Sequence, residues 1–171
     1  MLPLVQDQRL LIRYRTALVI FMVGLILSGL TAFPLLNDLR LLCNWLGIGE
    51  ATTPSEYSGF SKWILTVRIG LEEMHRVHPW IAYGTGWLAF AHLALAVFFI
   101  GPWIDPVRNV WVLKAGLVSC LMVLPLALIC GAIRGIPLGW RLIDCSFGVF
   151  GSIPLLYCLS VTRQMHKHAT A

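Results

Sequence analysis

Charged side chains are scarce in this sequence, at 12% of 171 residues. Hydrophobic residues make up 58% of the chain, and its mean hydropathy is +0.78. A soluble domain of this size could not bury so much apolar surface, so the composition excludes a water-soluble globular protein. Four spans of about 20 residues would use roughly half of the chain, which leaves room for one membrane domain over residues 1–171 and no second globular domain.

Motifs for metal, disulfide and catalytic chemistry are also missing. The five cysteines form no CxxC pair and have no zinc-ligand spacing, so they are interpreted as buried thiols. No nucleophile is paired with a base, and there is no P-loop and no HExxH motif, so we expect no catalytic activity from this chain on its own. The first apolar run has no small-residue cleavage site and continues to spanning length, so it is interpreted as a retained helix.

Four long apolar runs predict an all-α, polytopic membrane protein that is a bundle of four transmembrane helices. The predicted helices cover about residues 16–36, 79–100, 110–133 and 139–161. Pro34, Asn37 and Asp38 are expected to end the first, Gly101 and Pro102 to end the second, and Pro125 and Pro154 to kink the third and fourth.

The basic residues suggest an orientation. Arg9, Arg13 and Arg15 precede the first helix, and the C-terminal tail is basic. Positive charge favours the cytoplasmic side of a membrane, so we predict cytoplasmic N- and C-termini in a bacterial-type plasma (inner) membrane. The net charge of +5 is accordingly interpreted as a topology signal, and we expect no nucleic-acid partner.

The first outer loop, residues 37–78, is long for such a small protein. Its second half places Phe60, Trp63, Ile64, Val67 and Leu71 at helical spacing. This pattern predicts an amphipathic surface helix within the loop. Its apolar face would lie either on membrane lipids or on a partner subunit.

His92 is the clearest ionisable candidate within a predicted span, because it lies fourteen residues into the second helix and close to the bilayer midplane. Ionisable groups in the hydrocarbon layer are costly and therefore mark functional sites by default. One interpretation is a neutral imidazole hydrogen-bonded to a neighbouring helix. The other is a haem or metal ligand, or a hydrogen-bond donor in a quinone site.

A second cluster lies where the outer loop meets the second helix, in the run EEMHRVHPW. Glu72, Glu73, His75 and His78 are side chains that can bind a divalent metal on the outer face. Because the run lacks the HExxH order and a third fixed ligand, the alternative is that these histidines are solvated loop residues.

The spacing of the histidines adds a further possibility. Fourteen residues separate His78 from His92, which is nearly four helical turns and returns to the same face about 21 Å along the axis. The pattern HxxHPWxxxGxxxxxxxH, from His75 to His92, resembles the histidine-bearing helix of four-helix membrane cytochromes b of the cytochrome b561, formate dehydrogenase gamma and hydrogenase b-subunit type. The segment RYRTALVIFMVGLILSGLTAF resembles their first helix. The resemblance implies that His78 and His92 are axial ligands of haem b.

The sequence also departs from that family. The first helix has Tyr14, Arg15 and Thr16 where the family often has a histidine, and the third and fourth helices contain none. A haem would therefore need another side chain such as Met122, a histidine from a partner subunit, or a homodimer that places His92 opposite its copy. Otherwise the scaffold has lost its haem.

Three charged residues lie near the start of the fourth helix. Arg134, Arg141 and Asp144 could form a polar pocket for a quinone headgroup or a lipid phosphate. Because Arg141 and Asp144 are three positions apart, the alternative is an ion pair between them.

These features favour a small integral-membrane subunit, cytochrome-b-like in scaffold, that anchors or stabilises a respiratory or photosynthetic electron-transfer complex. The alternative is a haem b-binding electron carrier that exchanges electrons with quinone. A third hypothesis is an outer-face metal-binding membrane protein.

Overall fold

The computed structural model describes residues 2–169, with side chains described for residues 8–166. Over the described residues the chain is helical apart from short turns and loops, and it contains no strand. Four helical stretches are long and apolar enough to cross a membrane: Gln8–Ala32, Pro79–Ile104, Val110–Ile133 and Leu138–His166. The prediction of an all-α, multi-pass membrane protein with four spans is confirmed.

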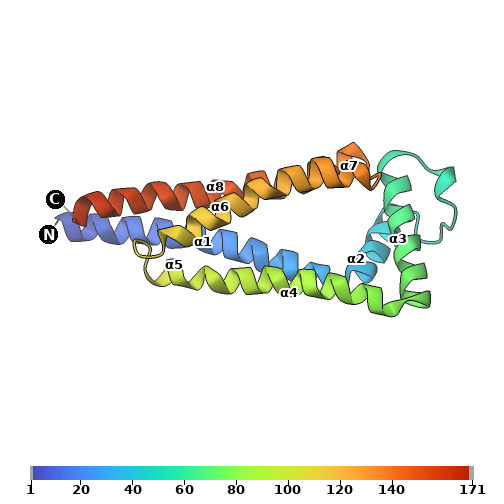
Figure 1. The fold of residues 1–171 in the computed structure, drawn as a ribbon, viewed down its shortest axis with the longest axis horizontal. Helices are drawn as coiled ribbons and strands as arrows, with labels where there is room; N and C mark the ends of the chain where they lie inside the picture. Colours follow the sequence, from blue (N-terminus) through green and yellow to red (C-terminus); the bar gives the residue numbers. More distant parts are fainter. Residues whose placement is uncertain (1, 170–171) are drawn as a thin grey trace. The chain divides into compact units, whose positions relative to one another are not determined.

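The chain forms two compact units, which are described separately. Unit 1 comprises residues 1–25 and 95–171. It contains the first part of α1 (Leu2–Ala32), then α5 (Ile100–Ile104), α6 (Val110–Pro125), the π-helical turn η3 (Leu126–Cys130), α7 (Gly131–Ile133) and α8 (Leu138–Ala169). Helix α6 runs along α8 (Figure 1). The core of unit 1 includes the fully buried side chains of Tyr14, Leu18, Leu113, Leu155 and Cys158.

The third and fourth helices match their predicted positions closely. The third spans 110–133 as predicted, and Pro125 is followed by the π-helical turn η3 in place of a simple kink. Helix α7 ends in a Schellman motif. Gly135 has a φ of 70°, and the amide of Ile136 bonds to the carbonyl of Gly131 at 2.9 Å. Helix α8 continues beyond the predicted end at residue 161 and reaches Ala169. The polar residues after 161 are compatible with a helix as well as with an irregular tail.

Unit 2 comprises residues 26–94. It contains the end of α1, then α2 (Leu35–Trp45), the 3₁₀ turn η1 (Pro54–Glu56), α3 (Gly59–Val77), the 3₁₀ turn η2 (Pro79–Ala82) and most of α4 (Tyr83–Phe98). Helices α2 and α3 pack together (Figure 1). Leu39, Cys43, Ile48, Ile64 and Leu65 are buried in this unit.

The predicted end of the first helix was right for Pro34 and wrong for Asn37 and Asp38. The helix stops at Ala32, Phe33 and Pro34 form a turn, and α2 begins at Leu35. Asn37 and Asp38 lie in the first turns of α2, where an acidic side chain is favourable, so they start a helix instead of ending one. Helix α2 ends at a second Schellman motif. Gly47 has a φ of 70°, and the amide of Ile48 bonds to the carbonyl of Cys43 at 2.9 Å.

The second helix was predicted to end at Gly101 and Pro102. In the structure α4 ends at Phe98, and after a turn at Phe99 the span continues through α5 to Ile104. Pro102 lies in the first turn of α5. Amides in the first turn of a helix have no acceptor within the helix, so the missing amide hydrogen of proline costs no hydrogen bond there. The predicted surface helix is present as α3. Ile64 and Leu65 on this helix are buried, and α2 packs against α3. Helix α2 therefore covers part of the apolar face that we predicted to lie on lipid or on a partner subunit.

Candidate functional site

His92 lies on α4 within the second span and is half-buried. Its Nδ1 lies 2.8 Å from the carbonyl oxygen of Leu88, one turn earlier on the same helix. Since a carbonyl only accepts, Nδ1 carries the proton, and in the neutral ring Nε2 keeps a free lone pair. Nε2 has no hydrogen-bond partner among residues 8–166. The imidazole is therefore oriented like the ligand histidines of metal and haem sites, in which one nitrogen is fixed and the other is open.

Helix α1 approaches α4 closely beside His92. A Cβ atom built on Gly29 would lie 2.9 Å from the carbonyl oxygen of Ala89 and 3.2 Å from the Cβ of His92. Only glycine allows this backbone approach. The structure defines one hydrogen bond of the His92 ring, and its acceptor lies on the same helix. One interpretation of His92 was a hydrogen bond to a neighbouring helix, and residues 8–166 show no such bond.

His78 lies outside α4, at the junction between α3 and η2. Its backbone has a φ of −137° and a ψ of 63°, and its ring meets that of Trp80 edge-on, with centroids 5.0 Å apart. A common face for His78 and His92 requires one continuous α-helix between them. Because η2 is a 3₁₀ turn and α4 begins only at Tyr83, the spacing of fourteen residues does not place the two histidines on one face.

The acidic and histidine side chains of the run EEMHRVHPW each have their own partner. Glu72 pairs with Arg40 on α2 at 2.9 Å, and Glu73 pairs with Arg76 at 2.7 Å. The hydrogen bond from Arg76 is the main cause that lowers the pKa of Glu73. His75 Nδ1 lies 2.7 Å from the carbonyl of Leu71. Within the described part of the chain, no group of three or more histidine, cysteine or acidic side chains is placed to hold a metal.

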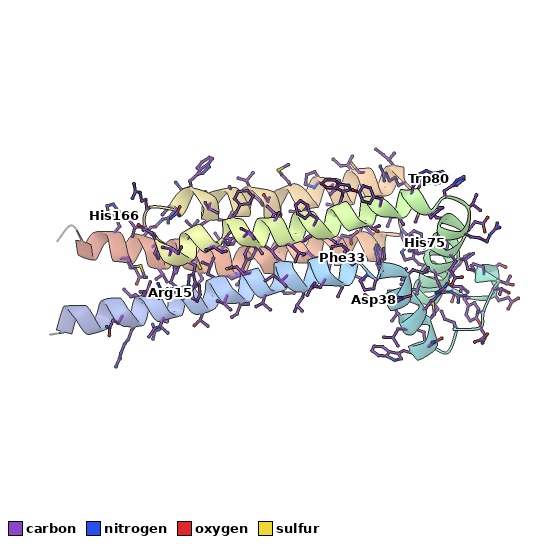
Figure 2. The ribbon with its side chains drawn as sticks, turned by 90° about the horizontal axis from the view of Figure 1, so that it is seen from below. Arg15, Phe33, Asp38, His75, Trp80 and His166 are labelled. Atoms are coloured by element: carbon purple, nitrogen blue, oxygen red, sulfur yellow. The ribbon has the colours of Figure 1, made fainter. Side chains whose placement is uncertain are left out.

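A cavity of about 240 Å³ lies beside His75 in unit 2. The turn after α1 forms one side of it with Phe33 and Asn37, and Leu71, His75 and Thr85 form the rest. Figure 2 shows His75 on α3 and Phe33 at the end of α1. The hydroxyl of Thr85 already donates to the carbonyl of Ala82 at 2.7 Å. Pockets that enclose drug-sized ligands measure about 300–1,000 Å³, so this cavity suits only a small group.

Arg68 is a buried residue that our sequence reasoning did not single out. Its side chain is 8% exposed, and its guanidinium donates to the carbonyls of Gly49, at 2.8 Å, and of Ala51. These bonds hold the segment after α2 against α3. A signal was present, because an arginine within the apolar positions of an amphipathic helix indicates a buried guanidinium with backbone acceptors.

Arg141 binds the end of the third span and does not pair with Asp144. Its Nη1 donates to the carbonyl of Leu128 at 3.1 Å. Its aliphatic part packs on Gly131, where an added Cβ atom would lie 2.8 Å from the Cδ of Arg141. The ion pair that we predicted as one alternative is therefore absent among the described side chains. Arg134 is exposed at the C-cap of α7. None of the three residues lines the cavity beside His75.

Comparison of the chain with protein-family models, with curated proteins and with solved structures finds no match.

Proposed function

We propose that this chain is a small integral-membrane subunit, cytochrome-b-like in scaffold, that anchors or stabilises a membrane electron-transfer complex. The observation that carries the proposal is the small buried share of the four spans, between 11 and 28% of the most apolar part of each. Large apolar side chains such as Phe90, Leu121 and Phe150 are exposed on three of them. These surfaces need lipid or the helices of other subunits to cover them.

Site-specific cross-linking within the membrane tests this proposal. A photoreactive amino acid at Phe90, Leu121 or Phe150 should cross-link to subunits that carry haem, flavin or iron–sulfur groups, identified by mass spectrometry. Leu113 is fully buried, so the same amino acid there is the matched control and should give no intermolecular product. Cross-links to lipid alone at all three exposed positions, in membranes that hold the native complexes, would contradict the proposal.

The second candidate function is a haem b-binding electron carrier that exchanges electrons with quinone. The fixed Nδ1 and open Nε2 of His92 favour it, because they suit one axial ligand of a haem. The residues fit the group in part, since the chain offers one such intramembrane imidazole. When bound, a haem would supply reversible one-electron transfer, and the close approach of α1 at Gly29 would hold α4 in place. The second ligand would come from a partner subunit or from a second copy of the chain.

A reduced-minus-oxidised visible spectrum and a pyridine haemochrome assay, on protein purified with its partners, test this second function. His92→Ala should remove the haem b band. His75→Ala is a matched control, because its Nδ1 also lies near the carbonyl four residues earlier, at 2.7 Å, but on α3 outside the spans. A colourless wild-type preparation would exclude the haem-binding function and leave only the anchoring function. A haem band that survives His92→Ala would assign the haem to another chain.

We infer in addition that both termini face the cytoplasm of a bacterial-type plasma membrane. The support lies in the sequence of unit 1, where the segments next to the span ends proposed to be cytoplasmic carry seven basic residues: Arg9, Arg13, Arg15, Arg108, Lys114, Arg163 and Lys167. The acids in the same segments are Asp7 and Asp105. Basic residues next to span ends stay on the cytoplasmic side during insertion.

A further inference from the structure

A cavity of about 240 Å³ in unit 1 lies between α8 and the segment that begins α6. Val107, Val110 and Lys114 border it on one side, and Leu159, Arg163 and His166 border it on the other. Neighbouring members of each set are three or four positions apart, which places each set along one side of its segment. The cavity is therefore bordered by two facing rows of side chains.

The floor of this cavity is apolar and its rim is cationic. Leu159 is 8% exposed and Val110 is half-buried, whereas Lys114 and Arg163 are exposed. The buried hydroxyl of Thr162 already donates to the carbonyl of Cys158 at 2.9 Å, so it offers no free donor to the floor. Lysine and arginine side chains bury their aliphatic stems and keep their charged ends in the polar layer. The occupant that fits is an amphiphile with a negative headgroup.

The depth of the cavity indicates the same ligand. The third span begins at Val110, and the apolar run of the fourth gives way to polar residues after Val161. Val110 and Arg163, which lie at these two points, both border the cavity. Figure 2 shows His166 near the end of α8. The cavity therefore lies where the hydrocarbon layer meets the headgroups, which is the depth at which a phospholipid carries its phosphate.

Charge around the cavity is strongly unbalanced. Neither Lys114 nor Arg163 forms a salt bridge with a carboxylate among residues 8–166. The nearby acid Asp105 accepts a hydrogen bond from the backbone amide of Arg108, at 2.9 Å. An excess of cations favours a lipid with a net negative charge over a zwitterionic one.

We propose that this cavity binds an anionic phospholipid. Lys114 and Arg163 contact the phosphate oxygens, and the first carbons of an acyl chain lie against Leu159. The volume suits the headgroup and the start of one chain, since it lies below the range of pockets that enclose whole drug-sized ligands.

Native mass spectrometry of the full chain in detergent, titrated with phosphatidylglycerol or phosphatidylcholine, tests the proposal. Wild-type protein should retain phosphatidylglycerol preferentially. The double variant Lys114→Gln/Arg163→Gln should bind it about thirtyfold more weakly, since each cation near the surface contributes about a factor of five. The matched control Arg9→Gln/Arg13→Gln removes the same charge from the same end but leaves the cavity intact, and should lose less than about threefold. Lys114→Arg/Arg163→Lys should bind like the wild type.

Each other outcome overturns the proposal. Equal weakening in both double variants would show diffuse attraction by the basic end, and equal binding of the two lipids would show apolar contact alone. Inorganic phosphate that displaces the lipid at equal concentration would make the cavity a site for free phosphate. Thermal unfolding of each variant shows whether its fold is intact, and because both substituted side chains are exposed we expect no change.

Discussion

Arg68 carries a positive charge that is almost removed from solvent, and its partners are backbone carbonyls. Two nitrogens of its guanidinium bind Gly49 and Ala51, while its Nε has no partner among the described residues. The planar fork of arginine reaches two acceptors at once, which a single ammonium group cannot do. We infer that this one side chain determines where the segment between α2 and α3 lies.

Arg68→Met should therefore destabilise unit 2 by roughly 2–4 kcal/mol, because it removes a buried guanidinium and leaves two part-buried carbonyls without donors. Hydrogen exchange of the amides in residues 46–58 should accelerate accordingly. Arg68→Lys should lose about half of that protection. Arg40→Met removes the exposed pair with Glu72 and should change stability by less than about 1 kcal/mol, so it serves as the control. Equal effects of the two methionine variants would contradict this role for Arg68.

At the level of helices, the four spans could be predicted from apolar length alone, and α3 could be predicted from its 3.6-residue period. Helix α2 could not be found in this way, because we took Asn37 and Asp38 to end a helix and did not consider that they start one. The signal that would have found α2 is Gly47 followed by the apolar Ile48, which is typical of a Schellman motif.

Much less of the candidate site could be predicted. The sequence identified His92, but the relation between His78 and His92 depended on a continuous helix. The change to a 3₁₀ turn after Pro79 depends on packing and has no sharp sequence signal. The choice of Arg141 between Asp144 and a backbone carbonyl depends on which helix lies beside it. One sequence on its own does not contain that information.

Helices α6 and α8 meet at a glycine. A Cβ on Gly148 would lie 2.5 Å from the carbonyl oxygen of Cys120 and 3.3 Å from the Cβ of Val123. Gly148→Ala should push the two helices apart and cost about 1–3 kcal/mol. Gly139, on the same helix, has no atom within 4 Å of its Cβ position, so Gly139→Ala is the matched control.

Thermal unfolding in detergent measures both glycine variants. Gly139→Ala should be neutral or slightly stabilising, because alanine favours the helix over glycine. A Gly148→Ala variant that unfolds at the wild-type temperature would show that α6 and α8 can separate without cost.

On the scale of the whole molecule, charge is divided unevenly between the two units. In the sequence, unit 1 contains nine basic residues and three acids, whereas unit 2 contains four basic residues and five acids. The insertion machinery responds mainly to basic residues, and by that count seven lie in the segments proposed to be cytoplasmic and six in the outer segments. The orientation that we propose therefore depends on a few arginines and lysines, and not on the charge of the outer loop.

Topology mapping tests that orientation. A phosphatase reporter that is active only outside the cytoplasm should be inactive when fused after residue 171 and active when inserted near Glu56. Replacing Arg9, Arg13 and Arg15 by glutamine should produce a mixed population. The same number of changes in the outer loop, at Arg40, Lys62 and Arg76, should not. An active C-terminal fusion in the wild type would contradict cytoplasmic termini.

The π-helical turn after Pro125 has a consequence for how the third span can change in length. Such a turn holds one residue more than an α-helical turn. The span can therefore lose a single residue between Leu126 and Cys130 by reverting to an α-helical turn. Gly131 would then stay against the stem of Arg141. Elsewhere in the spans, a one-residue deletion rotates everything that follows by about 100°. Residues 126–130 are thus the place where a codon can be deleted at least cost to the packing of the bundle.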